Sequence, residues 1–164
     1  MDFTNQHIVH IMLVLFTGLS AGLCFTWYNA ITPGIGRLDN LGYLNAFQQM
    51  NRAILNPLFI IVFFGPFLLG LINLYLFKNT SNLFIWLLIL ALACYFLGVL
   101  VVTVFGNVPL NDLLDKTNLE EASITDLQQL RNRFEVGWNR MHFIRTISSI
   151  ISFLLLIITF LIKK

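Results

Sequence analysis

The sequence predicts an all-α fold: a bundle of four transmembrane helices, with additional amphipathic helical segments between helices one and two and between helices three and four on one membrane side. Three observations predict it. Of the 164 residues, 57% are hydrophobic and 11% are charged, and the mean hydropathy is +0.79. A soluble domain carries roughly a quarter charged residues. Four apolar segments have the length, about 17–25 residues, that spans hydrocarbon as a helix. We place them at about 8–31, 57–77, 83–105 and 142–162, and we expect residues 1–164 to form a single integral membrane domain.

Charge and the first apolar segment indicate the surroundings of the protein. The formal net charge is +2, without a basic patch that interleaves aromatic residues. We therefore expect membrane lipids as partners and no nucleic acid. The first segment lacks a basic start and a small-residue cleavage site, so we interpret it as a retained helix rather than a signal peptide. These features favour an integral protein of a bacterial-type inner (plasma) membrane.

Two charge patterns favour opposite orientations. Lys and Arg are enriched in cytoplasmic loops, and most of them lie between helices one and two and between helices three and four. Several of these arginines belong to polar stripes on helices, however. The pair Lys163-Lys164 directly follows the last helix and, with Lys78, outweighs Asp2 on the side of the termini. We therefore expect cytoplasmic termini.

The first helix shows which side faces the bundle. Gly18 and Gly22 form a G-x-x-x-G pattern, which lets membrane helices approach closely. A stripe at alternating steps of three and four marks the bundle-facing side; it holds His7, His10, Val14, Thr17, Ala21, Cys24 and Tyr28. Trp27 and Tyr28 suit an interfacial aromatic belt. Residues 32–36 (Thr-Pro-Gly-Ile-Gly) are expected to break the helix.

Residues 41–56 are predicted to form an amphipathic helix. Its polar side holds Asn45, Gln48, Gln49, Arg52 and Asn56. Asn51 lies on the apolar side, where a buried amide needs partners. Asn56 and Pro57 mark the start of the second spanning helix. The polar turn at 78–82 makes helices two and three an antiparallel hairpin.

The stretch 103–111 (Thr-Val-Phe-Gly-Asn-Val-Pro-Leu-Asn) closes the third apolar run. Gly106 offers a helix stop, and Pro109 lacks an N–H. We expect the helix to break here and to free backbone carbonyls, which side-chain amides could satisfy. A simple Asn-rich capping turn is the alternative.

The fourth helix carries the longest polar stripe. Ser123 or Thr125 is the expected N-cap. At steps of four and three, the stripe holds Arg131, Glu135, Trp138, His142, Arg145, Ser149 and Ser152. Arg131 and Glu135 can pair at i, i+4. Arg145 lies at the apolar boundary, where it either snorkels to the headgroups or forms a buried functional charge with a partner.

The two cysteines are expected to remain unpaired. If alternate helices enter from the same side, Cys24 lies about 24 Å deep and Cys94 about 16 Å, at 1.5 Å per residue. A disulfide requires Cα atoms within about 7 Å, and the spacing of the cysteines is not that of a metal site.

The polar stretches at one end of the bundle predict a shared pocket. Two arginines near hydrocarbon are costly unless partners satisfy them, so we expect the residues around them to converge. The candidate catalytic residues are His142 as a general base, and Arg145 and Arg52 as stabilisers of an anion. The candidate ligand-binding residues are Asn51, Asn56, Thr103, Asn107, Asn111 and Trp138. We expect no metal site.

Four blocks of the sequence resemble the anthrone oxygenase-like (DUF1772) membrane proteins. They are the small-residue first helix, Asn51-Arg52 with Asn56-Pro57, Asn107-Val108-Pro109-Leu110-Asn111, and Trp138-Asn139 with Arg145-Thr146. The resemblance covers nearly the whole chain, and the third block is its most specific part. It implies a four-helix membrane protein. Some fungal members oxidise anthrones to anthraquinones with dioxygen, without a metal or flavin, so the resemblance also implies that no cofactor is needed.

Three classes of function remain open. The first is a membrane-embedded oxidoreductase that oxidises an apolar phenolic or polycyclic small molecule with dioxygen. The second is a non-catalytic protein that binds a lipid or quinone-like ligand in the polar pocket. The third is a structural or assembly partner whose polar cluster locks the bundle. A haem or metal protein is disfavoured, because the three histidines are poorly spaced.

Overall fold

The computed structural model describes residues 5–162, and these residues form helices joined by short turns, without strands. This confirms the predicted all-α class. The elements are α1 (Asn5–Thr26), a π-helical turn (Trp27–Ile31), α2 (Thr32–Ile35), α3 (Asn40–Ile54), α4 (Pro57–Leu76), α5 (Asn82–Tyr95), π-helical turns at Phe96–Val101 and Thr103–Asn107, α6 (Val108–Asp115) and α7 (Ile124–Thr159).

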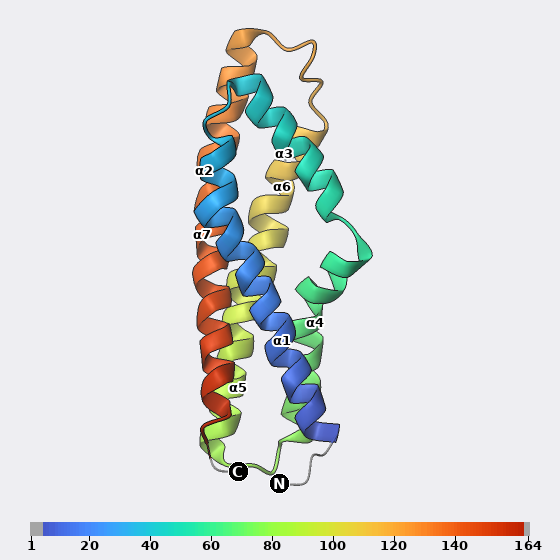
Figure 1. Ribbon diagram of the computed structural model, residues 1–164, viewed down its shortest axis with the longest axis vertical. Coiled ribbons are helices and arrows are strands. Elements are labelled where there is room, and N and C mark those ends of the chain that lie inside the picture. Colours follow the sequence, from blue (N-terminus) through green and yellow to red (C-terminus); the bar gives the residue numbers. More distant parts are fainter. Residues whose placement is uncertain (1–4, 163–164) are drawn as a thin grey trace.

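Four continuous helices are long and apolar enough to cross a membrane, as predicted. They are Asn5–Ile35, Pro57–Leu76, Asn82–Asp115 and Ile124–Thr159. α1 packs against α4 and α7, and α5 packs against the same two helices, so the four close into a bundle (Figure 1). α7 has 36 residues and is about 54 Å long at 1.5 Å per residue. Because the hydrocarbon core is about 30 Å thick, one end of the bundle extends beyond it.

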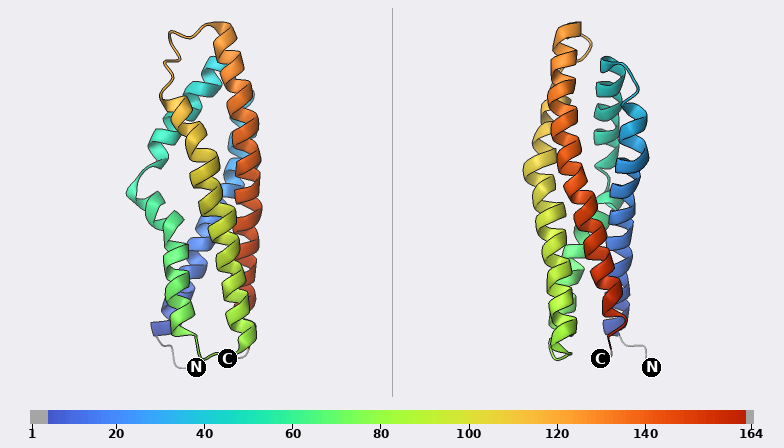
Figure 2. Two further views of the ribbon diagram at one scale, coloured as in Figure 1. Left: turned by 180° about the vertical axis from the view of Figure 1, so that it is seen from behind. Right: turned by 90° about the vertical axis from the view of Figure 1, so that its left-hand side faces the viewer.

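The start of α1 and the end of α7 both lie beside the turn that follows α4. The Gln6 side chain donates to the Leu76 carbonyl (3.3 Å). The His10 ring lies between Asn73 (3.0 Å) and Thr159 (2.7 Å). α1 therefore begins, and α7 ends, at the same end of the bundle (Figure 2). Asp2, Lys163 and Lys164, on which the predicted orientation depends, lie outside the described residues.

Side-chain caps fix where four helices begin. Asp39 accepts from the Gly42 N–H (2.7 Å) to start α3, and Asn56 accepts from the Phe59 N–H (3.0 Å) to start α4. Ser81 caps α5, and Ser123 forms a capping box with Asp126 at the start of α7. Such caps satisfy N–H groups that have no partner within the helix. The predicted Ser123 cap is confirmed.

The predicted break at Gly106–Pro109 is wrong, and the first helix ends within the predicted stretch 32–36, at Ile35, only after passing Pro33. In both helices a π-helical turn accommodates the proline. The helix continues through residues 32–35, and it continues through Gly106–Pro109. A proline lacks an N–H and clashes with the carbonyl four residues earlier. Each π turn ends two residues before a proline, Pro33 or Pro109, and widens the helix there. The N–H of Thr32 then bonds to the Trp27 carbonyl, and that of Val108 to the Thr103 carbonyl.

Pro66 lies inside α4, and a neighbouring helix satisfies the carbonyl that it leaves free. The Ser20 hydroxyl of α1 donates to the Val62 carbonyl (3.0 Å), four residues before the proline. The Tyr95 hydroxyl of α5 donates to the next carbonyl, Phe63 (2.7 Å). These bonds tie α1, α4 and α5 together at mid-depth, where hydrocarbon offers no alternative donor.

The predicted bundle-facing side of α1 is confirmed over its middle: His10, Val14, Thr17, Ala21 and Cys24 are buried. Gly18 packs closely against Phe153 of α7, whereas Gly22 has no side-chain neighbour. The G-x-x-x-G pattern therefore acts through one glycine. Cys24 and Cys94, both within the described residues, are free.

α3 lies across the projecting end of the bundle and packs on α6 and α7 (Figure 1). Its Tyr43 and Phe47 are fully buried against Phe134 and Trp138 of α7. The Arg131 guanidinium lies over the Tyr43 ring, 4.4 Å from its centroid. This aromatic cluster fixes the start of α7 relative to α3. It also covers the space between the helices on its inner side.

We predict that the turn at 77–81 and the loop at 116–123 lie on opposite faces of the membrane. Single cysteines at Asn79 and Asn118, in a chain with Cys24→Ser and Cys94→Ser, should react with a membrane-impermeant thiol reagent from opposite sides of sealed vesicles. Labelling of both positions from one side would contradict the four-span topology.

Candidate functional site

A cavity of about 110 Å³ lies where all four spanning helices and α3 meet. It is about 25 Å along α7 from Thr159, counted from His142 at 1.5 Å per residue, and so lies near the boundary of the hydrocarbon core. Six of the nine predicted site residues line it: Asn51, Thr103, Asn111, Trp138, His142 and Arg145.

Arg145 is the central charge of this cavity. Its side chain is buried, with 9% of the residue exposed, so it does not snorkel. One guanidinium nitrogen donates to the Thr103 hydroxyl (3.2 Å) and another to His142 Nδ1 (2.7 Å). The Thr103 hydroxyl donates its hydrogen bond to the Val99 carbonyl (2.6 Å), so its oxygen accepts the hydrogen bond from Arg145. Among the described residues, no carboxylate forms an ion pair with Arg145.

The partners of His142 determine its tautomer. A guanidinium has donors and no acceptor, so Nδ1 must accept from Arg145 and carries no proton. Nε2 lies 3.0 Å from the Cys24 carbonyl, to which it must donate. His142 is therefore a neutral imidazole in this arrangement. Its lone pair can take a proton once the Arg145 donor moves to another acceptor.

Aromatic rings form one wall of the cavity. The Trp138 ring is stacked on His142, with centroids 4.7 Å apart and planes at 21°. The Arg145 guanidinium lies 5.3 Å from the Trp138 ring centroid. The Trp138 N–H donates to Asn111 Oδ1 (2.9 Å), which fixes the indole. Trp27, predicted for an interfacial belt, is the first residue of the π turn and instead lines the cavity beside Trp138.

Two buried donors of the cavity have no hydrogen-bond partner within residues 5–162. They are Nε of Arg145 and Nδ2 of Asn51. A buried donor left unsatisfied costs about 1–3 kcal/mol. Both residues line the same space, so a ligand that carries an acceptor oxygen is the complementary occupant.

Three predicted site residues do not line the cavity. Asn107 is fully buried beside it and donates to the Trp138 carbonyl (3.2 Å), which holds the π turn against α7. Arg52 is half exposed and pairs with Asp115 on the outer surface (2.7 Å). Asn56 is exposed and serves as the cap of α4. At about 100° per residue, Arg52 lies a quarter-turn or more around α3 from Asn51, and Asn56 lies beyond the end of α3 at Ile54.

The apolar half of the cavity was not predicted from the sequence. Leu23, Ile54, Leu55, Phe59, Phe63 and Val108 supply it. The spacing of Phe59 and Phe63, one helical turn apart, was the available signal, but in a chain this apolar it does not distinguish a cavity wall from a lipid-facing surface.

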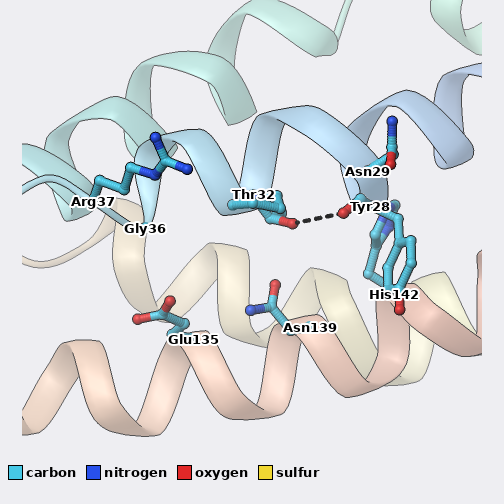
Figure 3. A pocket seen from close by; sticks show the side chains of 9 residues that line it. Tyr28, Asn29, Thr32, Gly36, Arg37, Glu135, Asn139 and His142 are labelled. Atoms are coloured by element: carbon cyan, nitrogen blue, oxygen red, sulfur yellow. Dashed lines mark hydrogen bonds between the residues drawn. The ribbon is translucent and has the colours of Figure 1, made fainter.

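A second, open groove of about 590 Å³ lies on the other side of His142, between α1–α2 and α7 (Figure 3). Tyr28, Asn29, Thr32, Pro33, Gly36, Arg37, Glu135, Asn139 and His142 line it. This groove was not predicted, because it forms only if α2 continues alongside α7, and the helix was expected to break at residues 32–36. Within residues 5–162, no group of three His, Cys, Asp or Glu side chains could hold a metal ion.

We predict that Arg145→Ala lowers stability, because it leaves the Thr103 hydroxyl and His142 Nδ1 without their donor at a cost of about 1–3 kcal/mol each. The midpoint of thermal unfolding in detergent should fall by several degrees. Arg133→Ala, on the exposed surface of α7, is the matched control and should leave the midpoint unchanged. Equal falls for both variants would contradict the role assigned to Arg145.

Comparison with known proteins agrees with the resemblance seen in the sequence. A family model described as anthrone oxygenase matches residues 58–155, more than half of the chain. The matched region includes every cavity residue contributed by α4, the π turn at Thr103–Asn107, α6 and α7. No curated protein and no solved structure matches the chain. The chain belongs to the anthrone oxygenase family.

Proposed function

We propose that this protein oxidises an apolar, electron-rich phenolic or polycyclic compound with dioxygen, and that the cavity at Arg145 is its active site. The observation that carries the proposal is a buried guanidinium, free of any carboxylate among the described residues, whose Nε is unpartnered. A buried charge is costly unless it is paired. The enolate of an anthrone-type substrate supplies the missing negative charge at the moment when it forms.

The chemistry is the conversion of a ring methylene to a carbonyl. A base removes one proton from the CH₂ group beside the aromatic rings, and the resulting enolate places its charge on the existing carbonyl oxygen. Dioxygen accepts two electrons as a C–O bond forms, which gives a hydroperoxide. Loss of water then leaves the second carbonyl. The balance is R₂CH₂ + O₂ → R₂C=O + H₂O, so no further oxidant or reductant is required.

In this proposal, Arg145 and Asn51 bind the enolate oxygen. Donors that face a developing oxyanion in a water-poor site lower the barrier more than the same donors in water. When Arg145 turns toward the oxyanion, His142 Nδ1 loses its donor and becomes free to accept the substrate proton. Trp138 supports the aromatic rings, and Thr103 orients Arg145.

The cavity must enlarge to admit such a substrate. Its 110 Å³ is below the roughly 300–1,000 Å³ of small-molecule sites. The joint between α3 and α4 is a tight turn in which the Asn56 N–H bonds to the Ile54 carbonyl (2.8 Å). Leu55 at its apex is 73% exposed, and both Ile54 and Leu55 line the cavity. We propose that an apolar substrate enters from the lipid by displacing this joint.

One observation favours a second candidate, a non-catalytic binder of a quinone-like or lipid carbonyl compound. The His142 lone pair is occupied by Arg145, so the resting site offers donors without a free base. A binder needs the donors of Arg145 and Asn51 and has no use for that lone pair.

Turnover of anthrone in nanodiscs separates the two candidates. We predict dioxygen consumption above the protein-free rate, with one anthraquinone formed per O₂. His142→Gln should lower kcat about 100-fold or more, the usual contribution of a general base. Arg52→Gln removes a guanidinium outside the cavity and should leave kcat unchanged. If the wild-type protein binds anthrone without consuming O₂, the oxygenase proposal is wrong and the binder is correct.

A further inference from the structure

We propose that the groove between α1–α2 and α7 is a water-filled proton route, which joins His142 to the aqueous phase through Asn139 and Glu135. The inference deepens the proposed function and rests on His142 acting as the base. His142 lines both the cavity at Arg145 and the open groove, and so borders the two spaces.

The neighbour of His142 explains why such a route is needed. Arg145 lies 2.7 Å from Nδ1 in the resting site, and when it turns toward the oxyanion it stays in the same cavity of about 110 Å³. An imidazolium formed by proton uptake would therefore still lie close to a guanidinium, and two like charges that are close together repel strongly in a medium of low dielectric constant. The second proton cannot stay on the ring. As Nδ1 takes the substrate proton, the proton on Nε2 must leave, and the Cys24 carbonyl that orients this N–H (3.0 Å) cannot keep it.

The groove offers the acceptors for this proton. Glu135, Asn139 and His142 follow one another at i, i+4 and i+7, so they share one face of α7, and Figure 3 shows all three on the side that faces α2. Asn139 Oδ1 is buried and has no hydrogen-bond partner among the residues that the structure describes. Buried polar atoms of this kind are satisfied by ordered water, which makes Asn139 a point of attachment for a water chain between His142 and Glu135.

Glu135 is placed to receive the proton at the outer end. One carboxylate oxygen accepts from Arg131 Nε (2.8 Å). The charged and titratable groups around it are Arg131 on its own helix, Arg37 across the groove and Tyr43 of α3. The carboxylate is 29% exposed, so it can exchange with solvent. Arg131 also binds the carbonyls of Gly36 and Leu38 (2.7 Å each), which fixes the groove wall.

The proton balance of the reaction fits this route. The proton removed from the methylene is held outside the cavity while the enolate reacts with dioxygen. It returns along the same groove to the peroxide anion that dioxygen forms, which gives the hydroperoxide. His142 then removes the remaining hydrogen of the methylene carbon as a proton while the O–O bond breaks, and this proton converts the leaving hydroxide to water. No net proton is consumed, and the product water has a polar exit from an otherwise apolar site.

Accessibility tests the groove without any enzymatic activity. In the chain with Cys24→Ser and Cys94→Ser, Asn139→Cys should react with a charged, membrane-impermeant methanethiosulfonate. Ser149→Cys, fully buried further along the same face, should not react. Protection of Asn139→Cys equal to that of Ser149→Cys would overturn the water-filled route, whether or not the protein oxidises anthrone.

Chemical rescue tests the relay itself. Glu135→Gln keeps the shape of the side chain but cannot take up a proton, so kcat for anthrone should fall at least tenfold with KM unchanged. Added imidazole, which the groove can admit, should restore part of the rate. Arg131→Gln breaks the same ion pair and leaves the carboxylate, so any loss should not be restored by imidazole. A Glu135→Gln enzyme that is fully active, or is insensitive to imidazole, would refute the relay while leaving the oxygenase proposal intact.

Discussion

A single buried guanidinium at the edge of the hydrocarbon core constrains the functional end of this protein. Arg145 lies where a charge is tolerated if protein groups satisfy it, and it has found neutral acceptors: the Thr103 hydroxyl and His142 Nδ1. These contacts fix the tautomer of His142 and leave one Arg145 donor unpartnered. Arg145 thus keeps His142 as a neutral base, and it supplies an unused donor and an uncompensated positive charge. Together these features suit a substrate that becomes an anion.

Pro33 and Pro109 help to form the site, because each is preceded by a π-helical turn that widens its helix. The π turns before Pro33 and Pro109 keep both helices continuous, and they place Trp27 and Thr103 in the cavity wall. π-helical turns are frequent at functional sites because they redirect side chains without ending a helix. The same continuity carries α2 alongside α7, which creates the outer groove and lets His142 border both spaces.

Much of the architecture could be predicted from the sequence, since apolar length and helical period depend on local composition. The four spans, the Ser123 cap, the Arg131–Glu135 pair and the buried stripe of α7 are examples. The continuation of the helix past Pro33 and through Gly106–Pro109 could not, because a proline gives the same local signal whether the helix ends or widens. Arg52 and Asn56 were grouped with Asn51 by sequence proximity, but Arg52 points about 100° away from Asn51 around α3 and pairs with Asp115. Asn56 lies after the end of α3 and caps α4.

In the proposed function, Arg145 binds its ligand as an oxyanion. The most direct measurement is the absorption spectrum of anthrone titrated with the protein under strictly anaerobic conditions, where the enolate is distinguishable from the neutral ketone and cannot be oxidised. We expect an enolate band at a pH where free anthrone remains neutral, and we expect that band to be lost in Arg145→Gln. A bound ligand that stays neutral in the wild-type protein, or an enolate band that persists in Arg145→Gln, would contradict it.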